Sequence, residues 1–407
     1  MTKTLRLTEH ESRPVPLTGL QARSLRDWKQ FVEVAPGSEA RWWELTAKHY
    51  VGTLVTKDLR ILIRPKIELE NVFLMLAVGL RHSDWRRETF GYEITGDLLP
   101  AMVAFFTRSG EQTLARGVYR SYQQRQERLK TIRGRIDLPA QFAQAGAAYP
   151  VGCRFREHTP NVIENRYLKA GIRQALRVPE IQAGVRQRLR RLLTALEEVS
   201  DVPVRPGLLD EVVFNRLQSH YEPTLRLARL LLENLTLQDE TGDAVASSFM
   251  IDMNFLFESF VTHRLRGALR GRLEVESQHS THLDLTDRVI IKPDLVFRRF
   301  GAPVFVGDLK YKLRDEPSKL PTSDLYQMLA YTTALGLPNG VLVYCRDSDG
   351  RATHHDEITV RHTDKVLHAW GIDMSGPPDS VEDEIRKLAD WIADRAGRAR
   401  RTWGLAG

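Results

Sequence analysis

The chain has 407 residues, which exceeds one ordinary hydrophobic core, so two or three domains are expected. Hydrophobic residues make up 42% of the chain, which excludes wholesale disorder. The chain has two cysteines, Cys153 and Cys345, too few for a disulfide framework or a four-thiolate zinc site. The net charge of +7 and the pI of about 9.4 favour a polyanionic partner such as nucleic acid.

No segment has the features of a secretion signal or a membrane span. The first ten residues lack the basic and then apolar pattern of a signal peptide. The longest apolar run, residues 72–80, is far shorter than a membrane-spanning helix, which needs about 20 residues. We therefore expect no membrane association and a cytoplasmic location, where the two thiols stay reduced.

Residues 1–145 are predicted to form a β-rich N-terminal domain with one helical stretch. Apolar and other residues alternate over 51–56 and 59–63, on both sides of a two-residue polar turn, which is typical of a β-hairpin. Residues 71–80 then have the apolar composition of a buried helix.

The end of this domain carries a dense basic segment. Two interpretations are open: a solvated helix face followed by a loop, or a surface that contacts phosphates or an acidic partner. Within twenty residues, the segment combines seven basic side chains with two tyrosines: Arg116, Tyr119, Arg120, Tyr122, Arg125, Arg128, Lys130, Arg133 and Arg135.

Residues 146–243 are predicted to form a helical middle region. Apolar residues at helical spacing and good helix formers occur over 165–176, 185–199 and 215–237. A stretch with two prolines, 200–206, is predicted to connect the second of these helices to the third.

Residues 244–407 are predicted to form a compact α/β domain, which makes the whole chain an α+β multidomain protein. Helical and strand-like segments alternate here, as they do in domains whose helices cover a sheet. The predicted order is a helix at 252–269, strands between 273 and 313, a helix at 324–335, a strand at 341–345 and a helix at 381–398.

Two strands of this domain carry three groups with the chemistry of a metal site. A hairpin centred on Gly301 pairs Asp294 with Asp308, and directly opposed residues share a face of the sheet. Lys310 joins that face because it lies two residues after Asp308. Two carboxylates and an ammonium group therefore converge, and without a cation the two carboxylates would repel each other.

The predicted cation is Mg²⁺, with Mn²⁺ as a substitute, because Mg²⁺ prefers hard oxygen ligands and keeps several waters. Asp294 and Asp308 would bind it, and the Leu309 carbonyl could complete the shell. Lys310 would orient or deprotonate the attacking water, or stabilise negative charge at a phosphate. The alternative is an exposed hairpin with a single Asp–Lys contact.

Two predicted helices flank the hairpin with further polar groups. Glu258 lies at the edge of an apolar stripe on the upstream helix, where it would add a metal ligand or anchor a metal-bound water; the alternative is a rim glutamate paired with an arginine. On the downstream helix, which Ser323 is predicted to cap, Gln327 and Tyr331 share one face. They could hold a phosphate or a water, or form the polar face of a packing helix.

In this order, the glutamate helix, the Pro-Asp hairpin, the Asp-x-Lys strand and the Gln-x-x-x-Tyr helix resemble the PD-(D/E)XK nuclease superfamily. More narrowly, the chain resembles the McrC family, the nuclease subunits of McrBC-type modification-dependent (type IV) restriction systems, over most of residues 50–345. Segments that match in kind and order lie at 51–67, 116–136, 161–169, 252–258 and 308–312.

The resemblance implies a PD-(D/E)XK nuclease domain at 244–407 that cleaves double-stranded DNA with Mg²⁺. It implies metal ligation by Asp294, Asp308 and Glu258, and catalytic roles for Lys310, Gln327 and Tyr331. One departure from the family is Gly307, directly before Asp308, which we expect to loosen the strand without harming the site.

The resemblance also implies a partner, a hexameric McrB-like AAA+ GTPase that recognises methylated cytosine in DNA. The N-terminal region of the present chain would stimulate GTP hydrolysis by that partner. Since the chain has no Gly-x-x-x-x-Gly-Lys-Ser/Thr loop, we expect GTP to be used by the partner alone.

Two other functions stay open. The chain could be a PD-(D/E)XK nuclease that serves another motor in defence or repair, or a non-catalytic scaffold that activates an AAA+ partner; the intact Asp, Asp and Lys disfavour the scaffold. No zinc site is expected at His279 and His282, which lack a third ligand, and His354 and His355 are expected in a loop.

Overall fold

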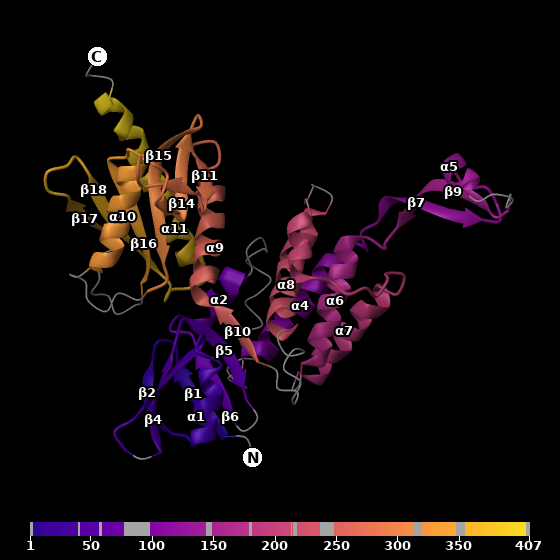
Figure 1. Cartoon of the computed structure of the whole chain (residues 1–407), viewed down its shortest axis with the longest axis horizontal. Helices are drawn as coiled ribbons and strands as arrows, with labels where there is room; N and C mark the ends of the chain where they lie inside the picture. The colour runs from indigo at the N-terminus through magenta and orange to yellow at the C-terminus, as the bar shows by residue number, and fades with distance from the viewer. Residues whose placement is uncertain are drawn as a thin grey trace. The chain divides into compact units, whose positions relative to one another are not determined.

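The computed structural model describes residues 3–39, 41–56, 59–76, 98–143, 149–178, 181–212, 214, 218–236, 248–312, 320–346 and 355–403 (Figure 1). Contacts divide the chain into two compact units, Met1–Thr89 with Met250–Gly407, and Phe90–Phe249. This division into two units does not test the boundaries of the three predicted domains, which stay a prediction. Among the described helices, none combines the length and the apolar character needed to cross a bilayer.

A four-stranded sheet opens the first unit, with the order β1-β6-β5-β10. Its strands are β1 (Lys3–Thr8), β6 (Leu59–Arg64), β5 (Tyr50–Val55) and β10 (Phe249–Asp252). Strands β5 and β6 pair in antiparallel fashion, so the predicted hairpin is confirmed, and β1 adds to β6 in parallel. The residues of its predicted turn lie outside the described residues.

A second, three-stranded sheet packs beside it, with the order β2-β4-β3. It consists of β2 (Ser12–Pro16), β4 (Trp42–Ala47) and β3 (Val32–Pro36), and α1 (Gly19–Arg26) begins at a capping box in which Thr18 and Gln21 exchange hydrogen bonds. Both sheets and α1 contribute to one apolar core, whose fully buried members include Leu25, Leu45, Leu54, Leu59 and Ile61.

The predicted buried helix is present as α2 (Leu69–Leu76), and the rest of its predicted span lies outside the described residues. Asn71 is fully buried on α2, and its side-chain amide donates to the carbonyls of Met374 (2.7 Å) and Gly376 (2.9 Å). These bonds tie the N-terminal part of the unit to the segment that leads into its last helix.

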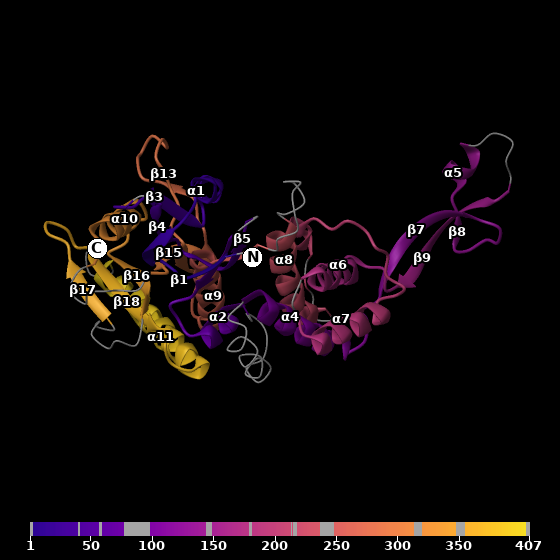
Figure 2. The ribbon, with the colours of Figure 1, turned by 90° about the horizontal axis from the view of Figure 1, so that it is seen from below.

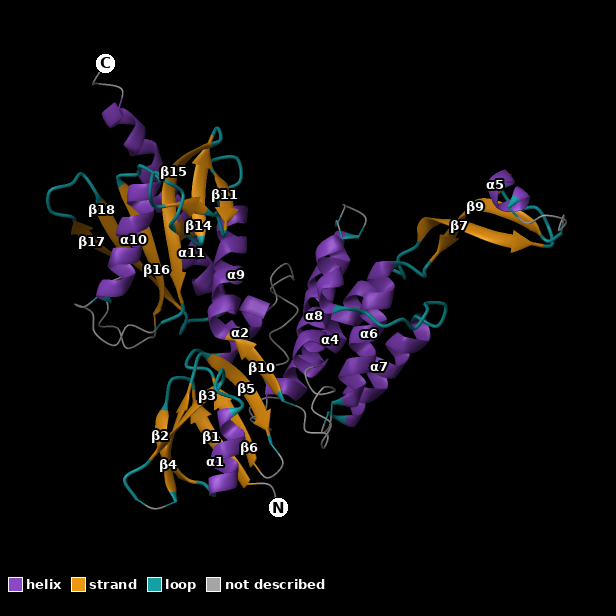
Figure 3. Cartoon of the chain, viewed as in Figure 1, coloured by secondary structure: helices purple, strands orange, loops and turns teal. Residues whose placement is uncertain are grey.

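A six-stranded mixed sheet forms the rest of the unit, with the order β11-β14-β15-β16-β18-β17 (Figure 3). Its central pairs β15–β16 and β16–β18 are parallel, and its outer pairs are antiparallel. The bounds are β11 (Glu274–Ser277), β14 (Leu295–Arg299), β15 (Ala302–Lys310), β16 (Asn339–Arg346), β17 (His355–Thr359) and β18 (Val366–Asp373), with a separate β12–β13 pair at Thr281–His282 and Ile290–Ile291.

Helices cover both faces of this sheet. Helix α10 (Thr322–Ala334) packs on one face through Met328, and α9 (Met253–Ala268) and α11 (Pro378–Trp403) pack on the other, where Phe305 meets Trp391 with ring centroids 5.8 Å apart. Figure 2 shows the sheet between α10 and α11. The region therefore contains both helices and strands, as the α/β prediction expected.

The described part of the second unit contains four long helices: α4 (Leu98–Leu114), α6 (Ile163–Arg177), α7 (Ala183–Ala195) and α8 (Glu222–Thr236). Helices α6 and α8 approach closely at Gly171, where a Cβ atom would lie 2.7 Å from that of Ala228. The connector predicted at 200–206 lies between α7 and α8 and is followed by short 3₁₀ turns at Pro206–Glu211 and Ser219–Tyr221.

Helix α4 was not predicted, because buried polar residues interrupt its apolar spacing. Ser109 and Thr113 lie in the core and hydrogen-bond the hydroxyl of Thr224 on α8, at 2.5 and 2.7 Å. Hydroxyl groups that hydrogen-bond each other can be buried at little net cost in free energy. The polar residues of α4 therefore do not mark an exposed face of the helix.

The basic segment forms a strand, so its interpretation as a helix face was wrong. Strand β7 (Ser121–Leu129) pairs with β9 (Val151–Thr159), which also pairs with β8 (Arg135–Ile136), and α5 (Leu138–Phe142) follows β8. Arg125 forms an ion pair with Glu157 on β9 at 3.2 Å.

Candidate metal centre

The β14–β15 hairpin brings the predicted carboxylates together. Leu295 pairs with Gly307, so Asp294 and Asp308, the next residues outward, lie opposite each other as predicted. The predicted register fails at the tip, where the pairing shifts after Phe297 and leaves Val304 as an extra residue on β15. The symmetric turn about Gly301 is therefore wrong, but the error does not reach the site.

Gly307 fits its position because a neighbouring ring needs the space. A Cβ atom there would lie 3.3 Å from the Phe297 ring and 3.5 Å from the Val341 side chain, in the sheet core. The glycine thus lets Phe297 pack against the strand that carries Asp308, and the expectation of a loosened strand receives no support from this packing.

Backbone contacts hold Asp294 in place at the start of β14. The Leu309 N–H donates to its Oδ2 atom at 2.8 Å, and its carbonyl accepts from the Gln278 N–H at 2.9 Å. The Gln278 side-chain amide lies 3.4 Å from Oδ1. These contacts aim the carboxylate at β15, where Asp308 lies.

Asp308 is a buried acid with an incompletely satisfied oxygen. Its exposed fraction is 1%, and Lys310 Nζ lies 2.6 Å from Oδ2. That ion pair does not have hydrogen-bond geometry, so among the described residues Oδ2 receives no hydrogen bond. Burial and then the charge of Asp294 raise the pKa of Asp308 to about 7. A cation at this point would relieve both the burial of charge and the repulsion.

Lys310 keeps its proton despite its half-buried position. Burial alone would lower the pKa of its ammonium group, but the carboxylates of Asp308 and Asp294 outweigh that effect and raise it. Lys310 therefore places a positive charge beside the two aspartates.

Glu258 joins the cluster from helix α9. The helix begins at Asp252, whose side chain caps it by accepting from the Phe255 N–H at 3.1 Å. Burial and then the charge of Asp294 raise the pKa of Glu258, so the two carboxylates are electrostatically linked. Glu258 accepts a short hydrogen bond from the amide of Gln278.

Gln278 is the residue that the sequence did not reveal. It bridges two of the predicted ligands, because its amide contacts both Glu258 and Asp294. Its backbone has a φ of 57°, in the left-handed region, which turns the chain after β11 toward the cluster. A lone glutamine after a strand carries no local signal for such a role.

Gln327 and Tyr331 lie together on α10, as predicted. The Gln327 amide donates to the Tyr331 hydroxyl at 2.7 Å, and that hydroxyl donates to the Lys292 carbonyl at 3.2 Å. Burial and then the charge of Asp308 raise the pKa of Tyr331, which places the phenol near the acidic cluster. Tyr331 thereby anchors the segment that leads into Asp294.

The start of α10 differs from the prediction. The helix begins at Thr322 with Pro321 at the N-cap, so the predicted cap by Ser323 is wrong. Asp324 is buried in the first turn, where Lys312 Nζ lies 3.1 Å away and the Tyr344 hydroxyl donates to it at 3.1 Å. With these partners, Asp324 is a satisfied structural acid, and its charge contributes to the raised pKa of Lys310.

The donors fit a hard divalent cation. Asp294, Asp308 and Glu258 offer carboxylate oxygens, which are the ligands that Mg²⁺ and Mn²⁺ prefer. The observation that supports this fit is the buried Oδ2 atom of Asp308, which contacts Lys310 but forms no hydrogen bond of good geometry with the described residues.

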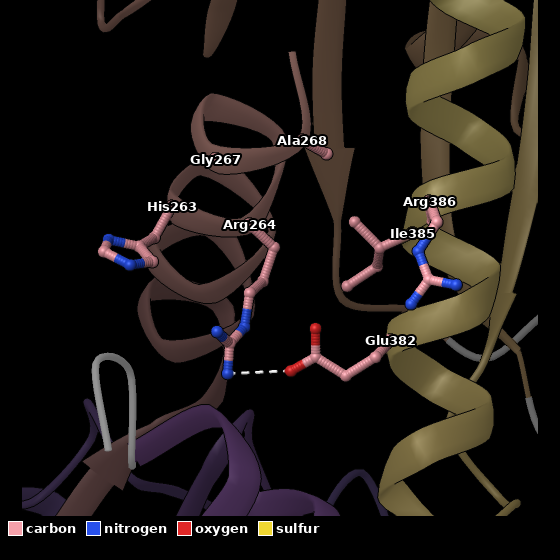
Figure 4. Close-up of a pocket in the computed structure, with 7 residues that line it drawn as sticks. All are labelled: His263, Arg264, Gly267, Ala268, Glu382, Ile385 and Arg386. Carbon is pink, nitrogen blue, oxygen red and sulfur yellow. Dashed lines mark ion pairs between the residues drawn. The ribbon is translucent and has the colours of Figure 1, made fainter. Parts of the chain in front are cut away.

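A hollow of about 240 Å³ lies elsewhere in the unit, between α9 and α11 (Figure 4). Arg264 and Glu382 form an ion pair across it at 2.7 Å, so its charges compensate each other. None of the predicted site residues is among those that line it, which are His263, Arg264, Gly267, Ala268, Glu382, Ile385 and Arg386.

Comparison with known proteins gives a consistent result. Residues 45–345 match the model of a family described as "McrBC 5-methylcytosine restriction system component". No curated protein matches the chain.

Two solved structures contain similar chains. One is a refined half-complex from a tetradecameric assembly of Thermococcus gammatolerans McrB AAA+ hexamers with bound McrC. The match to it has a TM-score of 0.56 and a sequence identity of 20%, and it covers 96% of this chain and 100% of the other. The other is the cryo-EM structure of the Thermococcus gammatolerans McrBC complex, with a TM-score of 0.45, 21% identity and coverage of 66% and 88%. The first match shows a shared fold.

Proposed function

The chain belongs to the family of McrBC 5-methylcytosine restriction system components, and from this premise we propose that it is the DNA-cleaving subunit of such a system. The observation that carries the proposal is Asp308, a 1% exposed acid beside Asp294, whose Oδ2 atom contacts the Lys310 ammonium group at 2.6 Å without hydrogen-bond geometry. A buried acid with this surplus of negative charge suits a site that takes up a divalent cation.

We assign the site to a PD-(D/E)XK nuclease domain. Asp294, Asp308 and Glu258 would hold Mg²⁺, which, when bound, supplies positive charge at a phosphate oxygen. Gln278 keeps two of these carboxylates in position through its side-chain amide. The protein thus holds three acids close together before the cation arrives.

Lys310 acts on the reacting phosphate. Its ammonium group stays protonated beside Asp308 and would stabilise the negative charge that develops when a phosphodiester bond is cleaved. Tyr331 acts as a positioning residue, because its hydroxyl already donates to the Lys292 carbonyl. Gln327 in turn orients that hydroxyl.

The proposed partner is an McrB-like AAA+ GTPase hexamer, which would use GTP and present modified DNA. The similar structure from Thermococcus gammatolerans is described as McrB AAA+ hexamers with bound McrC. The present sequence has no Gly-x-x-x-x-Gly-Lys-Ser/Thr loop, which fits a chain that relies on a partner for nucleotide hydrolysis. The N-terminal region would engage that partner.

The test is cleavage by the reconstituted complex. The chain would be purified with its proposed partner, an McrB-like AAA+ GTPase, and given Mg²⁺, GTP and either methylated or unmethylated double-stranded DNA. We expect GTP-dependent cleavage of the methylated DNA, and loss of cleavage in Asp308→Ala with complex assembly and GTP hydrolysis retained. Cleavage at the unaltered rate by Asp308→Ala would refute the site, and the absence of cleavage under all conditions would favour a scaffold.

A further inference from the structure

Strands β17 and β18 bring three potential metal ligands to one face of the large sheet. His355 and Glu357 lie two residues apart on β17 and therefore share a face. Glu357 pairs directly with His368 on β18, and His355 pairs with Trp370. His355 was predicted to lie in a loop, and this prediction was wrong, because the residue begins β17.

The donor atoms lie close enough together for one ion to reach all three. His355 Nε2 lies 3.2 Å from His368 Nδ1, and that atom lies 3.7 Å from Glu357 Oε2. One donor atom from each of the three residues lies within 4.8 Å of the others. Zinc bonds of about 2.0–2.1 Å in a tetrahedron place neighbouring ligand atoms roughly 3.3–3.4 Å apart, so small side-chain shifts suffice.

His368 is oriented in the manner of a metal ligand. Its Nε2 atom lies 3.1 Å from the carbonyl oxygen of the Asn339 side chain, and we assign the ring proton to Nε2, which leaves Nδ1 to accept from His355 Nε2 at 3.2 Å. Metal-ligating histidines typically donate their second ring N–H to such an oxygen.

Helix α11 holds the cluster in place. The Trp391 ring lies 5.0 Å from the ring of His355 and 4.9 Å from that of His368. Arg395 Nη2 lies 3.1 Å from Glu357 Oε2, and a carboxylate has enough lone pairs to serve both an arginine and a metal ion. The Glu357 side chain is 44% exposed, which leaves room for a water as a fourth ligand.

We propose that His355, Glu357 and His368 form a binding site for a divalent transition metal of the zinc class. Two imidazole nitrogens and one carboxylate suit Zn²⁺ and do not suit Mg²⁺, which takes oxygen ligands. The ion would fasten β17, the edge strand of the sheet, to β18. The proposal does not depend on the nuclease function.

The test uses the full-length chain with Asp308→Ala, in excess Mg²⁺, so that the acidic cluster does not take up the probe. Co²⁺ is the probe, since its visible absorption bands report a nitrogen-containing site of low coordination number. We expect one equivalent of Co²⁺ to bind, Zn²⁺ to displace it, and Zn²⁺ to raise the melting temperature.

Matched variants locate the ion. His355→Ala and Glu357→Gln should each lower the Co²⁺ affinity by at least about tenfold, and His355→Ala should abolish the zinc-dependent rise in melting temperature. The control is His282→Ala, a histidine that also faces a carboxylate, at 3.3 Å from Asp287, and it should bind as the parent does. Absence of Co²⁺ bands in the parent, or equal affinity in His355→Ala and His282→Ala, would overturn the proposal.

Discussion

The two faces of the six-stranded sheet carry different coordination chemistry. On the face covered by α10, Asp308 and Lys310 of β15 follow Val306, which packs in the core with Met328. On the face covered by α11, His368 of β18 meets Trp391. Strand alternation alone separates the two sets, because successive side chains point to opposite faces.

Under the two proposals, one sheet presents ligand sets for two kinds of cation. On the α10 face, Asp308 belongs to a cluster of carboxylates, which suit a hard ion and which Glu258 joins from α9. On the α11 face, two imidazole rings lie together and suit a borderline ion. Strand β16 contributes to both faces and lies between β15 and β18 in the sheet. Each of the following variants should therefore affect one face and leave the other unchanged.

The largest effect is expected from Asp308→Ala. Removal of a metal ligand should reduce the rate of DNA cleavage by the complex by at least about 10³-fold. This loss is larger than the one expected when a single group that stabilises charge at a reaction centre is removed. Co²⁺ binding at the α11 face should not change. The measurement is the cleavage rate under single-turnover conditions, with Asp364→Ala, an exposed acid between β17 and β18, as control. A similar loss in both variants would contradict the assignment.

The acidic site was predictable because its chemistry repeats with the period of a strand. Asp308 and Lys310 share a face by spacing alone, and the hairpin places Asp294 opposite Asp308. The tip of the hairpin was not predictable, because the bulge at Val304 depends on packing of the turn and not on residue type.

Residues that act across the fold left no local signal. Gln278 serves the site through a left-handed backbone angle and contacts with a helix and a strand that are distant in sequence. His355 lies in a strand because it pairs with Trp370 and packs against Trp391. Both partners are distant in sequence, so the residues next to His355 do not indicate these contacts. Local propensity yields to tertiary packing in such edge strands.

The second largest effect is expected from Lys310→Ala. The ammonium group lies beside Asp308 and would oppose charge at the phosphate, so its loss should slow cleavage by about 10²-fold. Metal binding at the α10 face should persist, because the carboxylates remain. The control is Lys387→Ala, an exposed lysine of α11 that pairs with Glu384 at 2.9 Å. Loss of Mg²⁺ binding together with cleavage would show that Lys310 maintains the site and does not act on the substrate.

A smaller effect is expected from Glu258→Gln. The amide keeps the shape of the side chain but removes a charge that Asp294 already disfavours, so cleavage should fall by about tenfold. The sharper readout is the Mg²⁺ concentration for half-maximal cleavage, which should rise. The matched control is Glu274→Gln, an exposed residue of β11. An unchanged Mg²⁺ requirement would remove Glu258 from the ligand set.

The smallest effect is expected from Tyr331→Phe, which keeps the ring on α10 and removes only the hydroxyl. That hydroxyl accepts from Gln327 and donates to the Lys292 carbonyl, so its loss should lower the free energy of unfolding by about 1 kcal/mol. Cleavage should fall only a few-fold, because Asp294 keeps its bond from the Leu309 N–H. Tyr326→Phe, on the same helix but 69% exposed, should change neither quantity. A loss of cleavage as large as that of Lys310→Ala would mean that the phenol touches the substrate, and that α10 supplies a catalytic group as well as a cover for this face.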